Sequence, residues 1–217
     1  MQFFVDGTEI EAPVTGLIVA GWTGRNPEGV QHHIEELAAL GVAPPSQVPL
    51  FYRVSTSLLV QSSEIDVLGA ATSGEVEPLL IKLNGELFLG LGSDQTDRDI
   101  EAVSVAASKQ ACPKPVSATL WRFEEVAPHL DQLVLRCEIQ EGGNWTLYQE
   151  GTLAGIRPLG ELAGNAGLVD GQAMLCGTLG TIGGVRPAGA YRMSLSDPVR
   201  DRTLELGYRV RSLPVVV

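Results

Sequence analysis

The sequence predicts an α+β fold that is predominantly β, with few and short helices. Short runs of alternating or continuous apolar residues recur along most of the 217 residues, and 25 glycines and 13 prolines supply tight turns between them. A single segment has a long helical pattern. Because 44% of the residues are hydrophobic, the chain can bury a substantial core. We therefore expect a globular protein of short strands joined by tight turns.

The first expected elements are a hairpin and a buried strand. Asp6-Gly7 lies between two short alternating runs, which is a hairpin signal. The apolar run in residues 15–22 ("TGLIVAGW") predicts a strand inside a sheet. Residues 124–132 and 157–164 are expected to form short helical pieces. The rest of the chain is expected to be strand and turn.

The clearest helix starts after Asn26. Asn26 can cap it, Pro27 suits the first helical position, and Gly41 with the prolines that follow ends it. At about 100° per residue, one face of this helix is apolar and is expected to be buried. That face consists of Val30, Ile34, Leu37 and Gly41.

Two adjacent histidines on this helix point in different directions. His33 lies about 60° from the apolar face with Glu36 beside it, whereas His32 and Glu35 point to the opposite side, toward solvent. A carboxylate beside an imidazole fixes its tautomer and raises its basicity, as a general base requires. His33 and Glu36 are therefore candidate catalytic residues. The alternative is a half-buried histidine at the helix edge with a chance salt bridge.

A pair of glutamates precedes an apolar strand in the segment "TSGEVEPLLIKL". Glu75 and Glu77 leave the same face of an extended chain, where their charges repel each other. Asn84-Gly85 is a hairpin signal, so the next strand should run back and bring Asp94 or Asp97 to the glutamates. Three converging carboxylates suit Mg²⁺, Mn²⁺ or Ca²⁺. The alternative is an acidic cluster at the surface that holds no ion.

Composition disfavours several classes of function. A formal net charge of -11 disfavours nucleic acid and anionic membranes as partners. No apolar run reaches the roughly 18 residues of a membrane span, and the N-terminus lacks a basic region before an apolar run, so we expect a cytoplasmic protein. Cys112, Cys137 and Cys176 are widely spaced and form no CxxC pair. They are expected to be buried, reduced thiols.

Several charged and glycine-rich motifs follow one another along the sequence. A Glu-x-Glu pair is followed by "SDQTDRD" (residues 93–99), by Lys109 and by "GTIGGV" (residues 180–185). This order resembles the fumarylacetoacetate hydrolase superfamily, whose members carry a Glu-x-Glu pair, an "NDVTARD"-like segment, a downstream lysine and a "GTPxGV" loop. The family's His-x-x-Glu before a "PxxF" segment matches His33 and Glu36 before "PLFYR". The resemblance spans roughly residues 20 to 212.

The resemblance implies a role for each matched residue. The implied metal ligands are Glu75, Glu77 and Asp94, for Mg²⁺ or alternatively Mn²⁺ or Ca²⁺. The implied catalytic residues are His33, Glu36 and Lys109. The implied substrate-binding residues are Arg98, Gly180 and Thr181. Two departures stand out: Ser93 replaces the family's asparagine, and "SKQACPKPVSATLW" matches the lysine motif only loosely, which leaves Lys114 as an alternative to Lys109.

The resemblance also implies a fold and an activity. The fold would be a fumarylacetoacetase-like mixed β-roll, with an N-terminal hairpin and strand segment over residues 1–20 and a catalytic domain over residues 21–217. The activity would be that of a metal-dependent hydrolase or lyase that cleaves a carbon–carbon bond, or decarboxylates, a small β-diketo or 2-oxo acid through a metal-stabilised enolate. His33 would draw a proton from water and Lys109 would stabilise the oxyanion.

Alternatives to this activity stay open. The chain could be an isomerase or hydratase of the same family. It could also be a metal-containing protein that binds an oxo acid without turnover. A homodimer is expected from the resemblance and from the apolar segments "LIVAGW" and "LPVVV".

Overall fold

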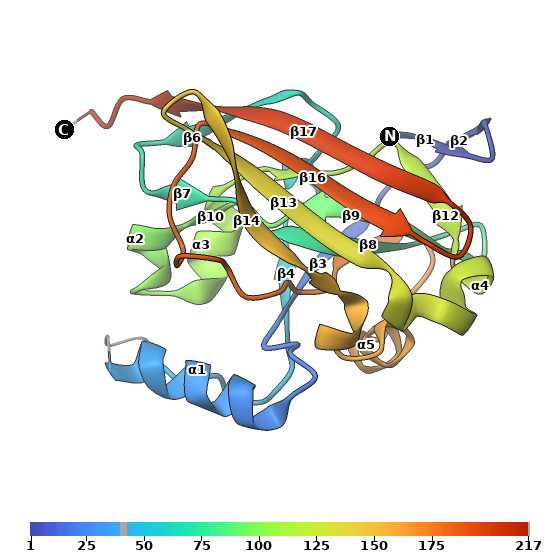
Figure 1. The fold of residues 1–217 in the computed structure, drawn as a ribbon, viewed down its shortest axis with the longest axis horizontal. Helices are drawn as coiled ribbons and strands as arrows, with labels where there is room; N and C mark the ends of the chain where they lie inside the picture. Colours follow the sequence, from blue (N-terminus) through green and yellow to red (C-terminus); the bar gives the residue numbers. More distant parts are fainter. Residues whose placement is uncertain (40–42, 217) are drawn as a thin grey trace.

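The computed structural model describes residues 1–39 and 43–216, and for residues 33, 36 and 37 it describes the backbone alone. The chain is mostly strand with few helices, as Figure 1 shows. The predicted α+β, predominantly β class is therefore confirmed.

Two sheets form the body of the protein in the described part of the chain. The larger sheet has eight strands in the spatial order β2 (Thr8–Glu11), β1 (Gln2–Val5), β12 (Thr119–Arg122), β9 (Glu86–Ser93), β8 (Val76–Leu83), β15 (Gln172–Leu175), β3 (Gly16–Gly21) and β4 (Leu50–Val54). The other has five, in the order β14 (Asn144–Thr152), β13 (Val134–Glu141), β16 (Ala190–Asp197), β17 (Arg202–Leu213) and β6 (Glu64–Leu68). Both sheets are mixed, because β15 runs parallel to β3 and β17 runs parallel to β6, whereas most other pairs are antiparallel.

Short elements connect and cover these sheets. Two small ladders pair β7 (Thr72–Ser73) with β10 (Thr96–Asp97) and β5 (Leu59–Val60) with β11 (Lys114–Pro115). The α-helices are α1 (Pro27–Ala39), α2 (Arg98–Glu101), α3 (Val105–Ala111), α4 (Phe123–Val126) and α5 (Leu159–Ala166). The 3₁₀ helices are η1 (Thr56–Leu58), η2 (Ala127–Gln132) and η3 (Leu153–Gly155). The helical pieces predicted at 124–132 and 157–164 are confirmed by α4 with η2 and by α5.

The hydrophobic core has two layers, one on each face of the larger sheet. Leu80 and Leu89 belong to the layer between the two sheets, together with Leu135 and Leu195 of the five-stranded sheet. Leu79 and its neighbours on the same face belong to the second layer. Because side chains alternate along a strand, the face of β8 that carries Leu79 also carries Glu77. The acidic pair thus lies on the outer layer of the larger sheet.

Local turn chemistry places the hairpins as predicted. Asp6 and Gly7 have φ of 51° and 76° and join β1 to β2, with Val5 paired to Thr8. Asn84 and Gly85, with φ of 53° and 82°, join β8 to β9. Positive φ at both central residues is what a tight type I′ hairpin needs, and Asn-Gly and Asp-Gly adopt it readily. The division of the chain after residue 20 stays a prediction.

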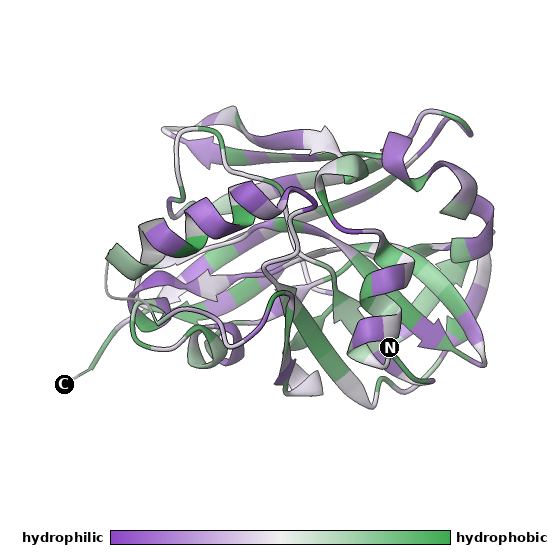
Figure 2. Ribbon diagram, turned by 90° about the horizontal axis from the view of Figure 1, so that it is seen from below, coloured by the Kyte–Doolittle hydropathy of each residue, from purple (hydrophilic) through white to green (hydrophobic). Residues whose placement is uncertain are grey.

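The helix α1 begins where the sequence predicts, but the two residues of its apolar face whose side chains the structure describes are not fully buried. The Asn26 side chain accepts a hydrogen bond from the Glu28 N–H at 3.1 Å, which confirms the cap. Val30 and Ile34 are only half-buried, so for these two residues the predicted buried stripe is wrong; the Leu37 side chain and Gly41 lie outside the described residues. The reason is that α1 lies apart from the two sheets in Figure 1, and Figure 2 shows it with both polar and apolar faces. His32 and Glu35 are exposed, as predicted.

Burial bears on two further expectations. Cys112, Cys137 and Cys176 are buried free thiols, as predicted. The run Leu17–Ala20 is buried within the chain itself, so it offers no reason for a homodimer, whereas Val215 and Val216 remain 62% and 87% exposed. None of the helices in the described residues is long and apolar enough to cross a bilayer.

Candidate functional site

Five strands of the larger sheet meet at one edge. β9, β15 and β3 end there, and β8 and β4 begin there, because Val76 pairs with Ser93, Leu79 with Leu175, and Gly21 with Leu50. Polar residues and glycines follow or precede these strand ends. They are Thr23, Glu75, Asp94, Gly177 and Thr178. This edge is where the predicted site residues come together.

The β8–β9 hairpin brings Asp94 opposite Glu75. The register that pairs Val76 with Ser93 continues one residue outward, where the Asp94 N–H donates to the Glu75 carbonyl oxygen at 3.0 Å. Glu75, Glu77 and Asp94 therefore share one face, and Glu77 and Asp94 are 2% and 0% exposed. Asp97, the other aspartate considered, caps α2 instead by accepting from the Ile100 N–H at 3.0 Å.

Two buried lysines hold Asp94. Lys109 on α3 donates to Asp94 Oδ2, and Lys114 Nζ on β11 lies 3.0 Å from Asp94 Oδ1. Burial alone would raise the pKa of Asp94, but the two lysines outweigh it and hold that pKa well below its usual value. Asp94 is thus ionised at neutral pH.

The two lysines differ in their surroundings. Burial lowers the pKa of Lys109, but Asp94 and then Glu77 raise it above the ordinary value, so Lys109 is protonated. Burial lowers the pKa of Lys114 by more than Asp94 raises it, and its ammonium also donates to the Gln95 carbonyl oxygen. The Lys109 side chain is 9% exposed and lies 5.9 Å from the centre of the Tyr52 ring, whereas Lys114 is fully enclosed. Both candidate lysines therefore reach the site, and Lys109 is the one nearer solvent.

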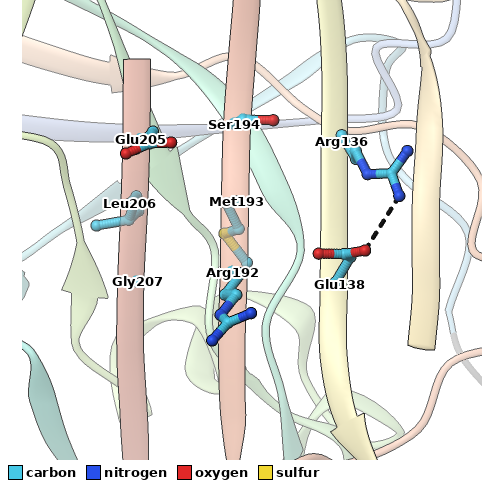
Figure 3. A pocket seen from close by; sticks show the side chains of 8 residues that line it. All are labelled: Arg136, Glu138, Arg192, Met193, Ser194, Glu205, Leu206 and Gly207. Carbon is cyan, nitrogen blue, oxygen red and sulfur yellow. Dashed lines mark hydrogen bonds and ion pairs between the residues drawn. The ribbon is translucent and has the colours of Figure 1, made fainter. Parts of the chain in front are cut away.

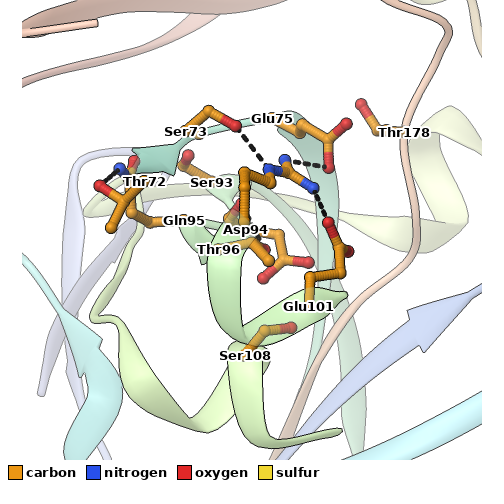
Figure 4. A network of polar contacts seen from close by, with 12 residues as sticks. Thr72, Ser73, Glu75, Ser93, Asp94, Gln95, Thr96, Glu101, Ser108 and Thr178 are labelled. Atoms are coloured by element: carbon orange, nitrogen blue, oxygen red, sulfur yellow. Dashed lines mark hydrogen bonds and ion pairs between the residues drawn. The ribbon is translucent and has the colours of Figure 1, made fainter. Parts of the chain in front are cut away.

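Glu75 and Glu77 have different partners. Arg98 Nη2 lies 3.1 Å from Glu75 Oε2, and the same guanidinium binds Glu101 and Ser73 at 2.7 Å each (Figure 4). Glu77 Oε2 accepts a hydrogen bond from the Gly177 N–H at 2.7 Å. Burial, and next the negative charge of Asp94, raise the pKa of Glu77 well above its usual range. The charge of Glu77 is thus the least compensated in the cluster.

The loop after β15 contacts the glutamate segment through a Gly-Thr pair. Leu175 pairs with Leu79, so Gly177 falls opposite Glu77 in the continued register. Thr178 Oγ1 donates to the Val76 carbonyl oxygen at 2.6 Å, and Figure 4 shows it beside Glu75. Gly177 has φ of 90°, and a Cβ there would lie 1.7 Å from Thr23 Oγ1. Only glycine fits this close approach.

The motif match in the sequence predicts the other Gly-Thr pair of this loop, Gly180 and Thr181, as the substrate-binding pair. Gly180 is exposed and Thr181 is half-buried, whereas Gly177 and Thr178 donate the hydrogen bonds to Glu77 Oε2 and to the Val76 carbonyl oxygen. The signal for the missed pair was present in "LCGTLGTIGGV", which contains both. The choice between them needed the pairing of β15 with β8, which no local motif reveals.

The proposed catalytic dyad remains a prediction. His33 and Glu36 lie in α1, but their side chains are outside the part of the chain that the structure describes. Nothing about their contacts enters the geometry of the site.

The oxygen atoms of the three carboxylates are suitable ligands for a divalent ion. Among the described residues, no three His, Cys, Asp or Glu side chains are arranged as a formed metal site. Arg98 instead pairs with Glu75, and Lys109 and Lys114 pair with Asp94. Three carboxylates on one face nevertheless form the donor set that Mg²⁺, Mn²⁺ or Ca²⁺ prefers. Asp94 Oδ1 is buried and makes no hydrogen bond, although it lies beside the Lys114 ammonium. The residues that could hold an ion are Glu75, Glu77 and Asp94.

A groove elsewhere on the surface is separate from this site. It lies on the outer face of the five-stranded sheet (Figure 3), whereas the carboxylates lie at the edge of the larger sheet. Two of its charged side chains, Arg136 and Glu138, pair with each other at 3.0 Å. Exposed ion pairs of this kind are typical of a solvated sheet face.

Comparison with known proteins identifies the family. Residues 20–208 match DUF2848, a family described as protein of unknown function. The chain belongs to this family. No curated protein matches the DUF2848 chain in sequence.

Solved structures share the fold of this DUF2848 protein. One is 2-keto-3-deoxy-D-arabinonate dehydratase complexed with magnesium and 2,5-dioxopentanoate (14% identity, TM-score 0.61, covering 93% of this chain and 74% of that one). Another is maleylpyruvate hydrolase from Sphingobium sp. SYK-6 (14%, 0.60, 92% and 71%). A third is 5-carboxymethyl-2-hydroxymuconate delta-isomerase from Mycobacterium smegmatis (14%, 0.59, 96% and 84%). These are structures of the fumarylacetoacetate hydrolase superfamily, which confirms the resemblance seen in the sequence at the level of the fold.

Proposed function

We propose that this protein is a divalent-metal-dependent enzyme that cleaves or decarboxylates a small β-diketo or 2-oxo acid. One observation carries the proposal: Glu75, Glu77 and Asp94 share one face at a sheet edge, beside the buried Lys109. The fold it shares with a hydrolase, and with a dehydratase complexed with magnesium and a dioxo acid, supports it.

Each residue of the site has a part in this proposal. Glu75, Glu77 and Asp94 would hold Mg²⁺, or alternatively Mn²⁺ or Ca²⁺, and the ion would supply positive charge for the oxygens of the oxo acid. His33, oriented by Glu36, would take a proton from water. Lys109 would stabilise the oxyanion, and Arg98, Gly180 and Thr181 would contact the substrate.

Two alternatives use the same site. An isomerase or hydratase of the superfamily is favoured by the presence of an isomerase and a dehydratase among the structures that share the fold. A protein that binds metal and oxo acid without turnover would show ligand binding but no product. A homodimer and a cytoplasmic location remain predictions in either case.

Metal binding is the first test. Thermal melts with Mg²⁺, Mn²⁺ or Ca²⁺ against a chelator should show stabilisation, by about 2.7 kcal/mol at a 100-fold excess over the dissociation constant. Assays of the metal-loaded protein with acylpyruvates and oxaloacetate should then detect product. Failure of all three ions to shift the melt would contradict the proposal. Binding of metal and oxalate without turnover of any acid in the panel would favour the binding protein.

A further inference from the structure

A hydrogen-bonded network of buried polar side chains includes both sequence neighbours of Asp94. Ser93 and Gln95 flank Asp94 in the sequence, and both contact the Tyr208 hydroxyl, each at 2.8 Å. Gln95 Nε2 in turn donates to Thr72 Oγ1 at 2.8 Å (Figure 4). All four side chains are buried, and Tyr208 is only 3% exposed. Because Tyr208 belongs to β17, this network joins the five-stranded sheet to the carboxylate edge of the larger sheet.

The donor and the acceptor of each hydrogen bond in this network can be assigned. A tyrosine hydroxyl has one proton, and Tyr208 donates it to Gln95 Oε1. The Ser93 hydroxyl must therefore donate to Tyr208. Burial raises the pKa of Tyr208 well above its ordinary value, so this proton stays in place. Ser93 and Gln95, the residues on either side of Asp94 in the sequence, are thus both hydrogen-bonded to the Tyr208 oxygen.

The Tyr208 hydroxyl also lies against Gly74, the residue that precedes Glu75. A Cβ placed on Gly74 would be 2.1 Å from the Tyr208 oxygen and 2.8 Å from both Gln95 Oε1 and Ser93 Oγ. Three oxygens therefore converge on the backbone just before Glu75. The Gly74 N–H is itself bound by the Tyr191 hydroxyl at 3.0 Å.

We infer that Tyr208 is a positioning residue for the metal-binding carboxylates: through Ser93, Gln95 and its contact with Gly74, it holds the two strand ends that carry Asp94 and Glu75 at a fixed separation. The inference rests on the proposed function, since it concerns the same site. A divalent ion tolerates small errors in ligand position poorly, and groups that orient metal ligands typically contribute 10- to 100-fold to affinity. None of the four side chains in the network is among the proposed ligands of the ion.

Removal of the Tyr208 hydroxyl tests this inference. Tyr208→Phe keeps the ring, which stacks on Tyr191 with centroids 5.0 Å apart, and removes only the hydroxyl. We expect the Mn²⁺ dissociation constant, measured by titration calorimetry on folded protein, to rise about 10-fold or more. Ser93→Ala should have a similar effect, and the double variant should lose little more than either single one, because both act through the same hydrogen bond.

Tyr148→Phe is the matched control. Tyr148 is as deeply buried, but its hydroxyl accepts from the Arg186 N–H at 3.3 Å and, among the described residues, takes no part in the hydrogen bonds of Ser93, Gln95 or Gly74. It should lower the melting temperature without changing Mn²⁺ affinity. If Tyr208→Phe also lowers only the melting temperature, the inference is overturned; if that variant fails to fold, Ser93→Ala decides by the same criterion. Wild-type protein that binds no divalent ion would instead overturn the proposed function, and this inference with it.

Discussion

Replacement of Gly177 by alanine tests how the loop after β15 meets the sheet edge. A residue other than glycine at φ of 90° is strained, at a cost of about 1–3 kcal/mol. The new Cβ would also lie 1.7 Å from Thr23 Oγ1 and 2.9 Å from Thr23 Cβ. Thr23 is 3% exposed and its carbonyl accepts from the Arg157 N–H at 2.8 Å, so it has little room to move. Overpacking of this kind costs about 1–3 kcal/mol.

The two costs together predict a loss of about 2–6 kcal/mol in the free energy of unfolding. Urea denaturation in the presence of chelator measures this loss. Gly180→Ala in the same loop is the matched control, because a Cβ there meets no atom within 4 Å and φ is not positive. That control should change stability by less than about 0.5 kcal/mol. Thr23→Ala, added to Gly177→Ala, removes the Oγ1 clash but not the strain, and should restore part of the loss.

Gly177→Ala should be clearly more destabilising than Gly180→Ala, and equal losses of stability would contradict this prediction. In that case the loop does not press against Thr23, and the Gly177 N–H is not held against Glu77. If the added Thr23→Ala restores nothing, the backbone conformation rather than the clash carries the cost.

Three other predictions concern the base, a distant ion pair and assembly. His33→Ala should lower turnover by about 10²- to 10⁴-fold and leave metal affinity intact, whereas His32→Ala on the exposed face should lose little; equal effects in a rate assay would contradict the choice of His33. Burial would raise the pKa of Asp197, but backbone N–H groups and His129 at 2.9 Å hold it below the usual value, so its stabilisation is present above about pH 4 and is lost as the pH falls through the lowered pKa. Asp197→Asn should therefore lower the free energy of unfolding in urea at pH 7 and have a smaller effect near pH 2. Light scattering should give twice the 23.1 kDa of one chain, and a monomer mass would exclude the homodimer.

The carboxylate cluster could be predicted because its geometry is local. Asn84-Gly85 fixes a two-residue turn, and a two-residue turn fixes the register of the strands on either side. That register places Asp94 opposite Glu75, with Glu77 on the same face. The charge pattern of the hairpin is therefore readable from about twenty residues of sequence.

The surroundings of the cluster could not be predicted because they depend on distant pairings. Gly177 reaches Glu77 across 100 residues, and Tyr208 reaches Ser93 across 115. Which strands become neighbours is decided by packing of the whole chain, and no turn or capping motif records it. The apolar periodicity of α1 likewise indicates which face is apolar, but not whether the rest of the chain covers that face.

The carboxylates also have structural roles, which differ enough to guide the choice of variants. Glu77→Gln keeps an oxygen for the Gly177 N–H and removes a buried carboxyl group whose ionisation burial and Asp94 disfavour, so the stability of the metal-free protein should be unchanged or higher. Asp94→Asn leaves Lys109 and Lys114 buried without their counter-charge and should cost about 3–5 kcal/mol. Urea unfolding of both variants in chelator compares them directly. If Glu77→Gln is as destabilising as Asp94→Asn, the lysines depend on Glu77 as well, and loss of metal binding in that variant would no longer separate a ligand from a structural residue.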